Sequence, residues 1–277
     1  MKRVAIFYNP YSPESMRLSS QLGDWLRAHY IEVWRGTTGE ARGESESIDC
    51  SDLIIALGGD GTVLRAARLS INCGVPVLPV ALGHLNFMAE LMPEQLYDGL
   101  EKLLGGGGWY DERAMIAATI HRSDPRTPPT DMLALNEVLV GHSDINRVVT
   151  VDVEIYDAHL TTYHADGVIV ATATGSTAYA LSAGGPIIDP RSKALALVPV
   201  AAHLTNIPSL VLDDDAEVTL TLRGRNPAAF TADGRDQIAL SEGDRVEVRR
   251  AGQTCIFARV FPQSTFYARM TQRLRRD

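Results

Sequence analysis

The sequence predicts two domains of different class: an α/β domain with a parallel sheet, followed by a β-rich, sandwich-like domain. Strand-like and helix-like segments alternate over the first hundred residues, a rhythm typical of a parallel sheet with helices on its faces. Short strand-like segments with few helices make up most of the rest. The chain, at 277 residues, is long enough for two domains, and we place the boundary near residue 110.

The α/β domain opens with a compact apolar strand at 4–8. Ser12 and Pro13 then predict a helix start, because serine is a good N-cap and proline suits the first helical position. Apolar side chains follow at helical spacing: Leu18, Leu22, Trp25 and Leu26. Further strands are expected at 31–34, 53–57 and 75–82, and further helices at 63–71 and 93–104.

The β-rich domain is predicted from alternation and from turn signals. Val149, Val151 and Val153 share one face of a strand whose other face is polar. Turn pairs at Asp166-Gly167 and Asp233-Gly234 separate the segments, each within an Ala-Asp-Gly tripeptide. Strands are expected at 113–121, 133–140, 148–156, 168–171, 218–222, 228–232 and 245–249.

Composition excludes several classes of protein. Hydrophobic residues make up 45% and charged residues 22%, as in globular proteins, and no apolar run approaches the ~20 residues that span a bilayer. The net charge of −8 disfavours a nucleic-acid or membrane partner. Three cysteines without a C-x-x-C pair, and a first apolar run too short for a signal peptide, predict a cytoplasmic protein. The last arginines are interpreted as a solvated helix face: Arg269, Arg273, Arg275 and Arg276.

The first candidate site is the glycine-rich segment Gly58-Gly59-Asp60-Gly61-Thr62, directly after the strand at 53–57. Glycines let the chain turn sharply and approach a ligand, and main-chain N–H groups at a helix start suit a phosphate. Asp60 is expected to face that ligand. The segment is neither a Walker A loop nor a Gly-x-Gly-x-x-Gly fingerprint. The alternative is a simple tight turn, because Asp-Gly is a common turn pair.

The second candidate is Asn136-Glu137, within the strand expected at 133–140. Neighbouring side chains on a strand point to opposite faces unless a bulge intervenes. Burial of an unpaired amide or carboxylate costs a few kcal/mol, so each requires a partner or a cleft. The alternative is a strand end with one solvated residue.

The third candidate is the segment 163–190, in which small and hydroxyl residues follow an apolar strand. The hydroxyls are typical of a cradle for a polar ligand: Thr172, Thr174, Ser176 and Thr177. No Gly-x-Ser-x-Gly motif is present, so Ser176 is not interpreted as a nucleophile. The histidines form no H-x-x-x-H or H-E-x-x-H pattern, and no protein-bound metal is expected.

Taken together, these motifs resemble the NAD kinase family, whose members phosphorylate NAD on the adenosine 2′-hydroxyl. The segments 58–62 and 136–137 match its signature loop and its Asn-Glu pair. The most specific match is Asp166-Gly167 followed by 174–179 and 182–186. Diacylglycerol and sphingosine kinases share the kind of loop at 58–62 but not the 166–190 segment.

The resemblance implies a Rossmann-like α/β domain of residues 1–110, completed by 252–277, and a β-rich NAD-binding domain of residues 111–251. It implies an ATP- or polyphosphate-dependent kinase that uses Mg²⁺, with NAD and ATP as substrates. It also implies a homo-oligomer, a dimer or tetramer, whose ligand sites are built partly by a neighbouring subunit.

The resemblance makes Asp60 the general base that takes the 2′-hydroxyl proton. Nucleotide contacts are implied for Gly58, Gly59, Gly61, Thr62, Asn136, Glu137, Arg147, His164, Asp166, Thr174, Thr177, Ala178, Tyr179, Ala180, Leu181, Ser182, Ala201 and Arg235. The chain departs from the family pattern at Ala81, Asn86, Ala173 and Arg235. These departures motivate one alternative, a non-catalytic NAD(P)-binding regulator. A lipid kinase is the other, disfavoured because no amphipathic basic helix offers a membrane-docking face.

Overall fold

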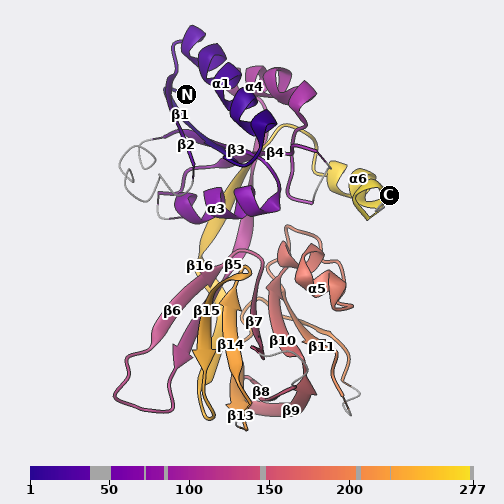
Figure 1. The fold of residues 1–277 in the computed structure, drawn as a ribbon. Helices are drawn as coiled ribbons and strands as arrows, with labels where there is room; N and C mark the ends of the chain where they lie inside the picture. Colours follow the sequence, from indigo (N-terminus) through magenta and orange to yellow (C-terminus); the bar gives the residue numbers. More distant parts are fainter. Residues whose placement is uncertain are drawn as a thin grey trace. The chain divides into compact units, whose positions relative to one another are not determined.

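The computed structural model describes residues 1–37, 51–71, 73–83, 87–143, 148–203, 207–224 and 226–274. The chain forms two compact units (Figure 1). Unit 1 comprises Met1–Glu112 with Cys255–Asp277, and unit 2 comprises Arg113–Thr254. Two long strands, β5 (Trp109–His121) and β16 (Arg245–Arg259), carry the chain from one unit to the other. Unit 1 is α/β and unit 2 is β-rich, so the predicted fold class is confirmed.

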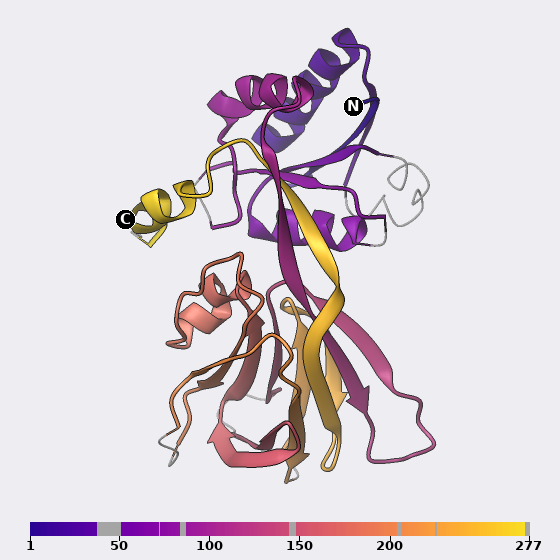
Figure 2. The same ribbon diagram turned by 180° about the vertical axis from the view of Figure 1, so that it is seen from behind.

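Unit 1 is built on a parallel sheet in the order β2-β1-β3-β4-β16. Helices α1 and α4 lie on one face of this sheet and α3 on the other (Figures 1 and 2). The strands before β16 are β1 (Arg3–Tyr8), β2 (Glu32–Gly36), β3 (Leu53–Leu57) and β4 (Val77–Val80). The helices are α1 (Pro13–Ala28), α3 (Asp60–Ser70), the 3₁₀ turn η2 (Pro93–Gln95), α4 (Leu96–Leu104) and α6 (Thr265–Leu274).

The start of α1 follows the sequence signals. The Ser12 side chain accepts a hydrogen bond from the Ser15 N–H at 3.2 Å, and Pro13 takes the first helical position. Leu22 and Leu26 are fully buried against the sheet. The start of α3 differs from prediction: the helix begins at Asp60 rather than residue 63, with Gly59 as its N-cap.

The strand order places the end of β3 at a switch point of the sheet. From β1 the chain crosses to β2 on one side, then returns past β1 to β3 and β4 on the other. Tyr8 pairs with Leu57, so the carboxyl ends of β1 and β3 are adjacent. In open α/β sheets, ligands bind outside the carboxyl ends of strands at such a point. The glycine-rich segment that follows β3 therefore occupies the expected binding position of this unit.

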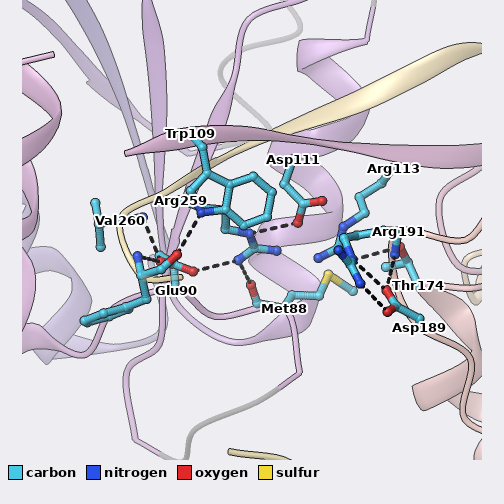
Figure 3. A network of polar contacts seen from close by, with 11 residues as sticks. Met88, Glu90, Trp109, Asp111, Arg113, Thr174, Asp189, Arg191, Arg259 and Val260 are labelled. Carbon is cyan, nitrogen blue, oxygen red and sulfur yellow. Dashed lines mark hydrogen bonds and ion pairs between the residues drawn. The ribbon is translucent and has the colours of Figure 1, made fainter. Parts of the chain in front are cut away.

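A buried ionic network attaches the C-terminal segment to unit 1 (Figure 3). The Arg259 guanidinium, 5% exposed, donates to Asp111 Oδ2 at 3.1 Å and to Glu90 Oε2 at 3.2 Å. The other Glu90 oxygen accepts the main-chain N–H groups of Val260 and Phe261 at 2.8 and 2.7 Å. Each buried charge thus has an opposite charge and hydrogen-bond partners, the condition under which burial is tolerated.

One arginine of the C-terminal cluster corrects the sequence analysis. Arg269 donates to the Glu90 carbonyl oxygen at 3.2 Å and its guanidinium lies over the Phe261 ring, 4.5 Å from the centroid. The prediction of a solvated helix face is therefore wrong for this residue. Helical spacing shows which residues share a face but not what that face contacts. Arg275 and Arg276, and the side chain of Arg273, lie outside the described residues.

Unit 2 contains two layers of mostly antiparallel strands. One layer is a six-stranded sheet, in the order β12 (Leu210–Leu212), β11 (Leu195–Val200), β10 (Gly167–Thr172), β7 (Glu137–His142), β14 (Ala228–Ala232) and β15 (Arg235–Leu240). The other contains parts of β5 and β16 with β6 (Thr130–Ala134), β8 (Val149–Ile155), β9 (Ala158–Ala165) and β13 (Val218–Arg223). Apolar side chains of both layers form one core, which includes Tyr163, Val168 and Phe230.

Three features of unit 2 differ from prediction. The strand expected at 133–140 is broken: β6 ends at Ala134 and β7 begins at Glu137. The strand expected at 245–249 continues to residue 259 as β16. Four strands had no counterpart among the predicted segments: β9, β11, β12 and β15. Within the part of the chain that the structure describes, no helix combines the length and apolar character needed to cross a membrane.

Candidate functional site

In unit 1 the glycine-rich segment forms a turn from β3 into α3. The Gly58 N–H donates to the Val80 carbonyl oxygen at 3.0 Å, and Gly58 has a φ of 156°. A Cβ atom on Gly58 would lie 2.5 Å from Thr62 Oγ1, so only glycine fits. Gly59 and Gly61 are exposed, and an added Cβ would meet nothing within 4 Å at either residue. The outer side of this turn is therefore open to a ligand.

Asp60 is the first residue of α3, and it is exposed. The first main-chain N–H groups of a helix lack carbonyl partners within it, and the helix dipole makes this end electropositive. Such an end binds phosphate groups. The turn can thus hold a phosphorylated ligand beside the carboxylate of Asp60.

Asn9 is a neighbour of this turn that the sequence analysis did not single out. Its N–H donates to Ser15 Oγ at 2.9 Å, and the Ser15 hydroxyl donates to the Leu57 carbonyl oxygen at 2.9 Å. Ser15 thereby joins the end of β1 to the end of β3. The available signal was Asn9-Pro10, which directly follows the strand at 4–8.

In unit 2 the break between β6 and β7 is a bend around one carboxylate. Asp233, in the turn from β14 to β15, accepts three successive main-chain N–H groups: Leu135 at 3.1 Å, Asn136 at 2.8 Å and Glu137 at 3.4 Å. The Asp233 N–H returns a bond to the Glu137 carbonyl oxygen at 2.9 Å. Asp233 has a φ of 51°, a left-handed conformation that aspartate tolerates better than most residues.

The bend is also held from the end of β10. The Thr172 hydroxyl donates to the Leu135 carbonyl oxygen at 2.6 Å, and the Thr172 N–H donates to the Asn136 carbonyl oxygen at 2.8 Å. A Cβ atom on Gly175 would lie 2.0 Å from that Asn136 oxygen, so glycine is required there. The main-chain N–H and C=O groups of residues 135–137 all have partners.

The side chains of the bend contrast with its backbone. Asn136 and Glu137 are 4% and 8% exposed, yet Asn136 Oδ1 and Glu137 Oε2 are buried without a hydrogen-bond partner among the described residues. Burial, with a further contribution from the Asp233 charge, raises the pKa of Glu137 to about 7, while the Tyr179 N–H opposes the rise. Buried unpartnered acceptors are costly and uncommon. These two oxygens are suited to a ligand that donates N–H or O–H groups.

The hydroxyls of the third candidate segment have mostly structural partners. Thr174 Oγ1 accepts from Arg113 at 3.1 Å (Figure 3), and the Thr177 hydroxyl donates to the Thr174 carbonyl oxygen at 3.1 Å. The Ser176 hydroxyl donates to the Ala173 carbonyl oxygen and accepts the Ile188 N–H. These side chains hold the turn formed by η3 (Gly175–Thr177) and α5 (Tyr179–Ser182). The Thr174 hydroxyl can still donate and the Thr177 hydroxyl can still accept, so ligand contacts at these two residues stay a prediction.

The remaining predicted residues of unit 2 fall into two groups. Residues 174–182 lie near the bend, through Gly175 and the Tyr179 N–H, and Arg235 begins β15 just after Asp233. Asp166 lies at the opposite end of the six-residue strand β10, about 20 Å away at ~3.3 Å per residue. His164 and Ala201 lie toward that far end, since the His164 carbonyl oxygen accepts the His203 N–H and Asp166 bonds to Val200.

Two predicted positions, Arg147 and Asn86, lie outside the described residues. Among the residues that are described, no three His, Cys, Asp or Glu side chains are grouped so as to hold a metal ion.

Comparison with protein families covers both units. Residues 4–108 match the ATP-NAD kinase N-terminal domain, and residues 135–260 match the ATP-NAD kinase C-terminal domain. The chain belongs to the NAD kinase family. The NAD kinase of Chloroflexus aggregans is 57% identical over 277 residues, which is all of both chains. That of Dehalococcoides mccartyi (strain CBDB1) is 36% identical over 274 residues, 99% of this chain and 96% of its relative.

Solved structures of NAD kinase family members share the fold. A yeast NADH kinase complexed with NADH has a TM-score of 0.88 at 21% identity, covering 99% of this chain and 87% of that chain. An Archaeoglobus fulgidus NAD kinase in complex with ATP has a TM-score of 0.79 at 22% identity, covering 99% and 98%. The family predicted from the motifs is confirmed, and the chain is an enzyme of the phosphotransferase class.

Proposed function

We propose that this chain transfers the γ-phosphoryl group of ATP to the adenosine 2′-hydroxyl of NAD, forming NADP and ADP. The observation that carries this proposal is the match to both NAD kinase domains, each of which contains one of the two candidate sites. The turn of unit 1 is suited to phosphates and the bend of unit 2 to hydroxyl and amino groups. NAD and ATP together offer both kinds of group.

The turn between β3 and α3 is the proposed donor site. Main-chain N–H groups in the first turn of α3 would bind the donor phosphates, and the open faces of Gly59 and Gly61 let those phosphates approach the backbone. No lysine occurs in the 58–62 segment, so most of the donor charge would be neutralised by the Mg²⁺ that arrives with ATP. The metal is thus part of the substrate, MgATP.

Asp60 is the proposed general base. As the bond between the 2′-oxygen and the γ-phosphorus forms and the bond to the ADP oxygen breaks, the 2′-hydroxyl proton passes to the Asp60 carboxylate. What supports this role is that Asp60 is exposed and is the first residue of α3, beside the turn proposed to bind the donor phosphates. General-base catalysis typically contributes ~10²–10⁴ in rate, with the low end expected for a loose phosphoryl-transfer transition state.

Asn136 and Glu137 are the proposed core of the NAD site. Their unpartnered oxygens would accept hydrogen bonds from the adenine amino group or from ribose hydroxyls of NAD. Thr174 and the residues from Thr177 to Ser182 would complete this end of the site, with Arg235 beside it. Arg147 is proposed as a further contact from the family resemblance alone.

A homo-oligomer, a dimer or tetramer, is part of the proposal. Asp166, His164 and Ala201 lie toward the end of β10 away from the bend, so one subunit presents its proposed NAD contacts in two separate groups. A neighbouring subunit that supplies the second group would complete the site. Light scattering should give a mass of at least twice 30.1 kDa, and a monomer at micromolar concentration would contradict this part.

We also propose a cytoplasmic location. The test of the activity is formation of NADP in a buffer with the pH and salt of the cytoplasm. NAD, ATP and Mg²⁺ should yield a product that an NADP-specific dehydrogenase reduces, and polyphosphate is tested in place of ATP. The matched control is NAD with a 2′-deoxyadenosine half. It lacks the hydroxyl that accepts the phosphoryl group and should give no product. Failure to form NADP with either donor would contradict the proposal, and NAD binding without turnover would favour the non-catalytic regulator.

A further inference from the structure

We propose that Asp233 is a positioning residue for the NAD site, acting through the bend at residues 135–137 and not through contact with the nucleotide. This inference rests on the proposed function, because it concerns how Asn136 and Glu137 come to present their side chains. The residue lies about a hundred positions further along the chain, in the turn between β14 and β15.

Several main-chain donors of the bend share the one Asp233 carboxylate. Asp233 accepts the N–H groups of three consecutive residues, at 3.1, 2.8 and 3.4 Å. Hydrogen bonds to an ionised acceptor are roughly twice as strong as bonds between neutral groups. β6 has ended and β7 is only beginning at these positions, so the carboxylate substitutes for the strand partner that these N–H groups would otherwise have.

The bend also affects the direction in which the side chains of residues 136 and 137 point. On a continuous strand, the side chains of residues 136 and 137 would point to opposite faces, and one would enter the apolar core. The bend interrupts this alternation, and both side chains are buried with an unpartnered acceptor oxygen. A network of main-chain bonds that fixes such acceptors before a ligand arrives reduces the ordering required on binding.

Asp233 also acts on Glu137 electrostatically. Burial raises the pKa of the Glu137 carboxyl most, and the Asp233 charge raises it further, while the Tyr179 N–H acts in the opposite direction. The same aspartate thus fixes the backbone at Glu137 and adds to the rise in the pKa of its carboxyl. A residue with a merely structural role would lack the second effect.

The test uses Asp233→Asn in the full-length protein. The neutral amide keeps one acceptor oxygen but loses the charge, so the KM for NAD should rise about tenfold or more, the range for loss of a charge-assisted hydrogen bond. The KM for ATP and kcat should stay within about threefold, because the donor turn belongs to unit 1. The midpoint of the pH profile of kcat/KM for NAD, which reports groups of the free enzyme, should move to lower pH.

A second readout needs no activity. Exchange of the amide protons of residues 135–137 with solvent should be at least about tenfold faster in Asp233→Asn than in wild type. The matched control is Asp157→Asn, another aspartate with positive φ in a tight turn, which should change neither the exchange rates nor the KM for NAD. Thr172→Val acts on the same bend from the β10 side and should raise the KM for NAD by a smaller factor.

The outcomes distinguish the positioning role of Asp233 from the proposed kinase activity. Faster exchange together with a raised KM for NAD supports the proposal, and either change without the other overturns it. A KM for ATP that rises in parallel, with a lowered Tm, also overturns it, because that is general destabilisation. If the wild type forms no NADP, the proposed function fails, and calorimetric titration with NAD replaces the KM; no binding to the wild type would overturn the proposal as well.

Discussion

The two candidate sites are built on opposite principles. The turn after β3 is exposed, and an added Cβ on Gly59 or Gly61 would meet nothing within 4 Å. The bend at residues 135–137 is buried, every main-chain polar group in it is bonded, and an added Cβ on Gly175 would lie 2.0 Å from a main-chain oxygen. The turn is open on the face that would contact a ligand. The bend is closely packed behind the unpartnered oxygens of Asn136 and Glu137.

This contrast matches two different tasks. A phosphate is large, charged and held by main-chain N–H groups at a helix end, so a donor site needs access more than a rigid surround. Recognition of a particular hydroxyl or amino group needs acceptor oxygens fixed within a few tenths of an ångström. We therefore expect changes in the turn to affect chemistry and changes in the bend to affect NAD binding and stability.

The largest effect is expected at Asp60. Asp60→Asn keeps the shape of the side chain and removes its basicity, so kcat should fall at least ~10²-fold. Steady-state kinetics with saturating NAD and ATP measures this directly. The matched control is Asp24→Asn on α1, another exposed aspartate in unit 1, paired with Arg27 at 3.0 Å, and it should leave kcat unchanged. A kcat near the wild-type value in Asp60→Asn would reduce the turn to a phosphate-binding role.

The next largest effect is expected on stability. Gly175, packed against the bend, and Gly61, in the open turn, should respond differently to the same substitution. Gly175→Ala forces a methyl group against the Asn136 carbonyl and should lower the free energy of unfolding by roughly 3 kcal/mol. Gly61→Ala places the same methyl group in open space within α3, where alanine favours the helix, so stability should be unchanged or rise by up to about 1 kcal/mol. Denaturant titration of both variants measures the difference, and equal losses would contradict the contrast.

Much of the fold could be predicted because its signals are local. Ser12-Pro13 specified the start of α1, and compact apolar runs specified β1 and β3. Long-range partners explain what was missed. Residues 133–140 have the composition of one strand, and the break within them depends on Asp233, which no local pattern connects to residue 136. Similarly, Arg269 contacts Glu90 and Phe261 through tertiary packing alone.

The candidate site was predictable by residue type but not by role. Asp60 and the glycines beside it stand where the motif suggested, at a strand end. The hydroxyls of Thr177 and Ser176 suggested a ligand cradle, yet they bond to nearby main-chain groups, which hydroxyls at turns commonly do. Asp233 was noted only as half of a turn pair, because sequence shows a residue's turn preference and not which distant N–H groups its carboxylate accepts.

A smaller effect is expected on the pH dependence of stability. The pKa of Glu137 is about 7 in the folded protein and 4.5 ordinarily, so the folded state holds a proton that the unfolded state releases between these values. The contribution of Glu137 to the free energy of unfolding is therefore most favourable below pH 4.5. This contribution falls as the pH rises to about 7. Glu137→Gln should remove this loss and raise the free energy of unfolding at pH 8 by on the order of 2 kcal/mol.

The control for that measurement is Glu217→Gln, an exposed glutamate of unit 2. It should leave the pH dependence of unfolding as in the wild type. If Glu137→Gln is no more stable than wild type at pH 8, then burial of the Glu137 carboxyl does not destabilise the unliganded protein.

We assign chemistry to the turn and NAD binding to the bend. Calorimetric titration of NAD into Asp60→Asn and Asp233→Asn tests this assignment most directly. Both variants lose one carboxylate charge by the same chemical change. The Kd for NAD should change by less than about tenfold in Asp60→Asn, under 1.4 kcal/mol, and should rise by about tenfold or more in Asp233→Asn. Weakened binding in Asp60→Asn with unchanged binding in Asp233→Asn would contradict the assignment of chemistry to the turn and NAD binding to the bend.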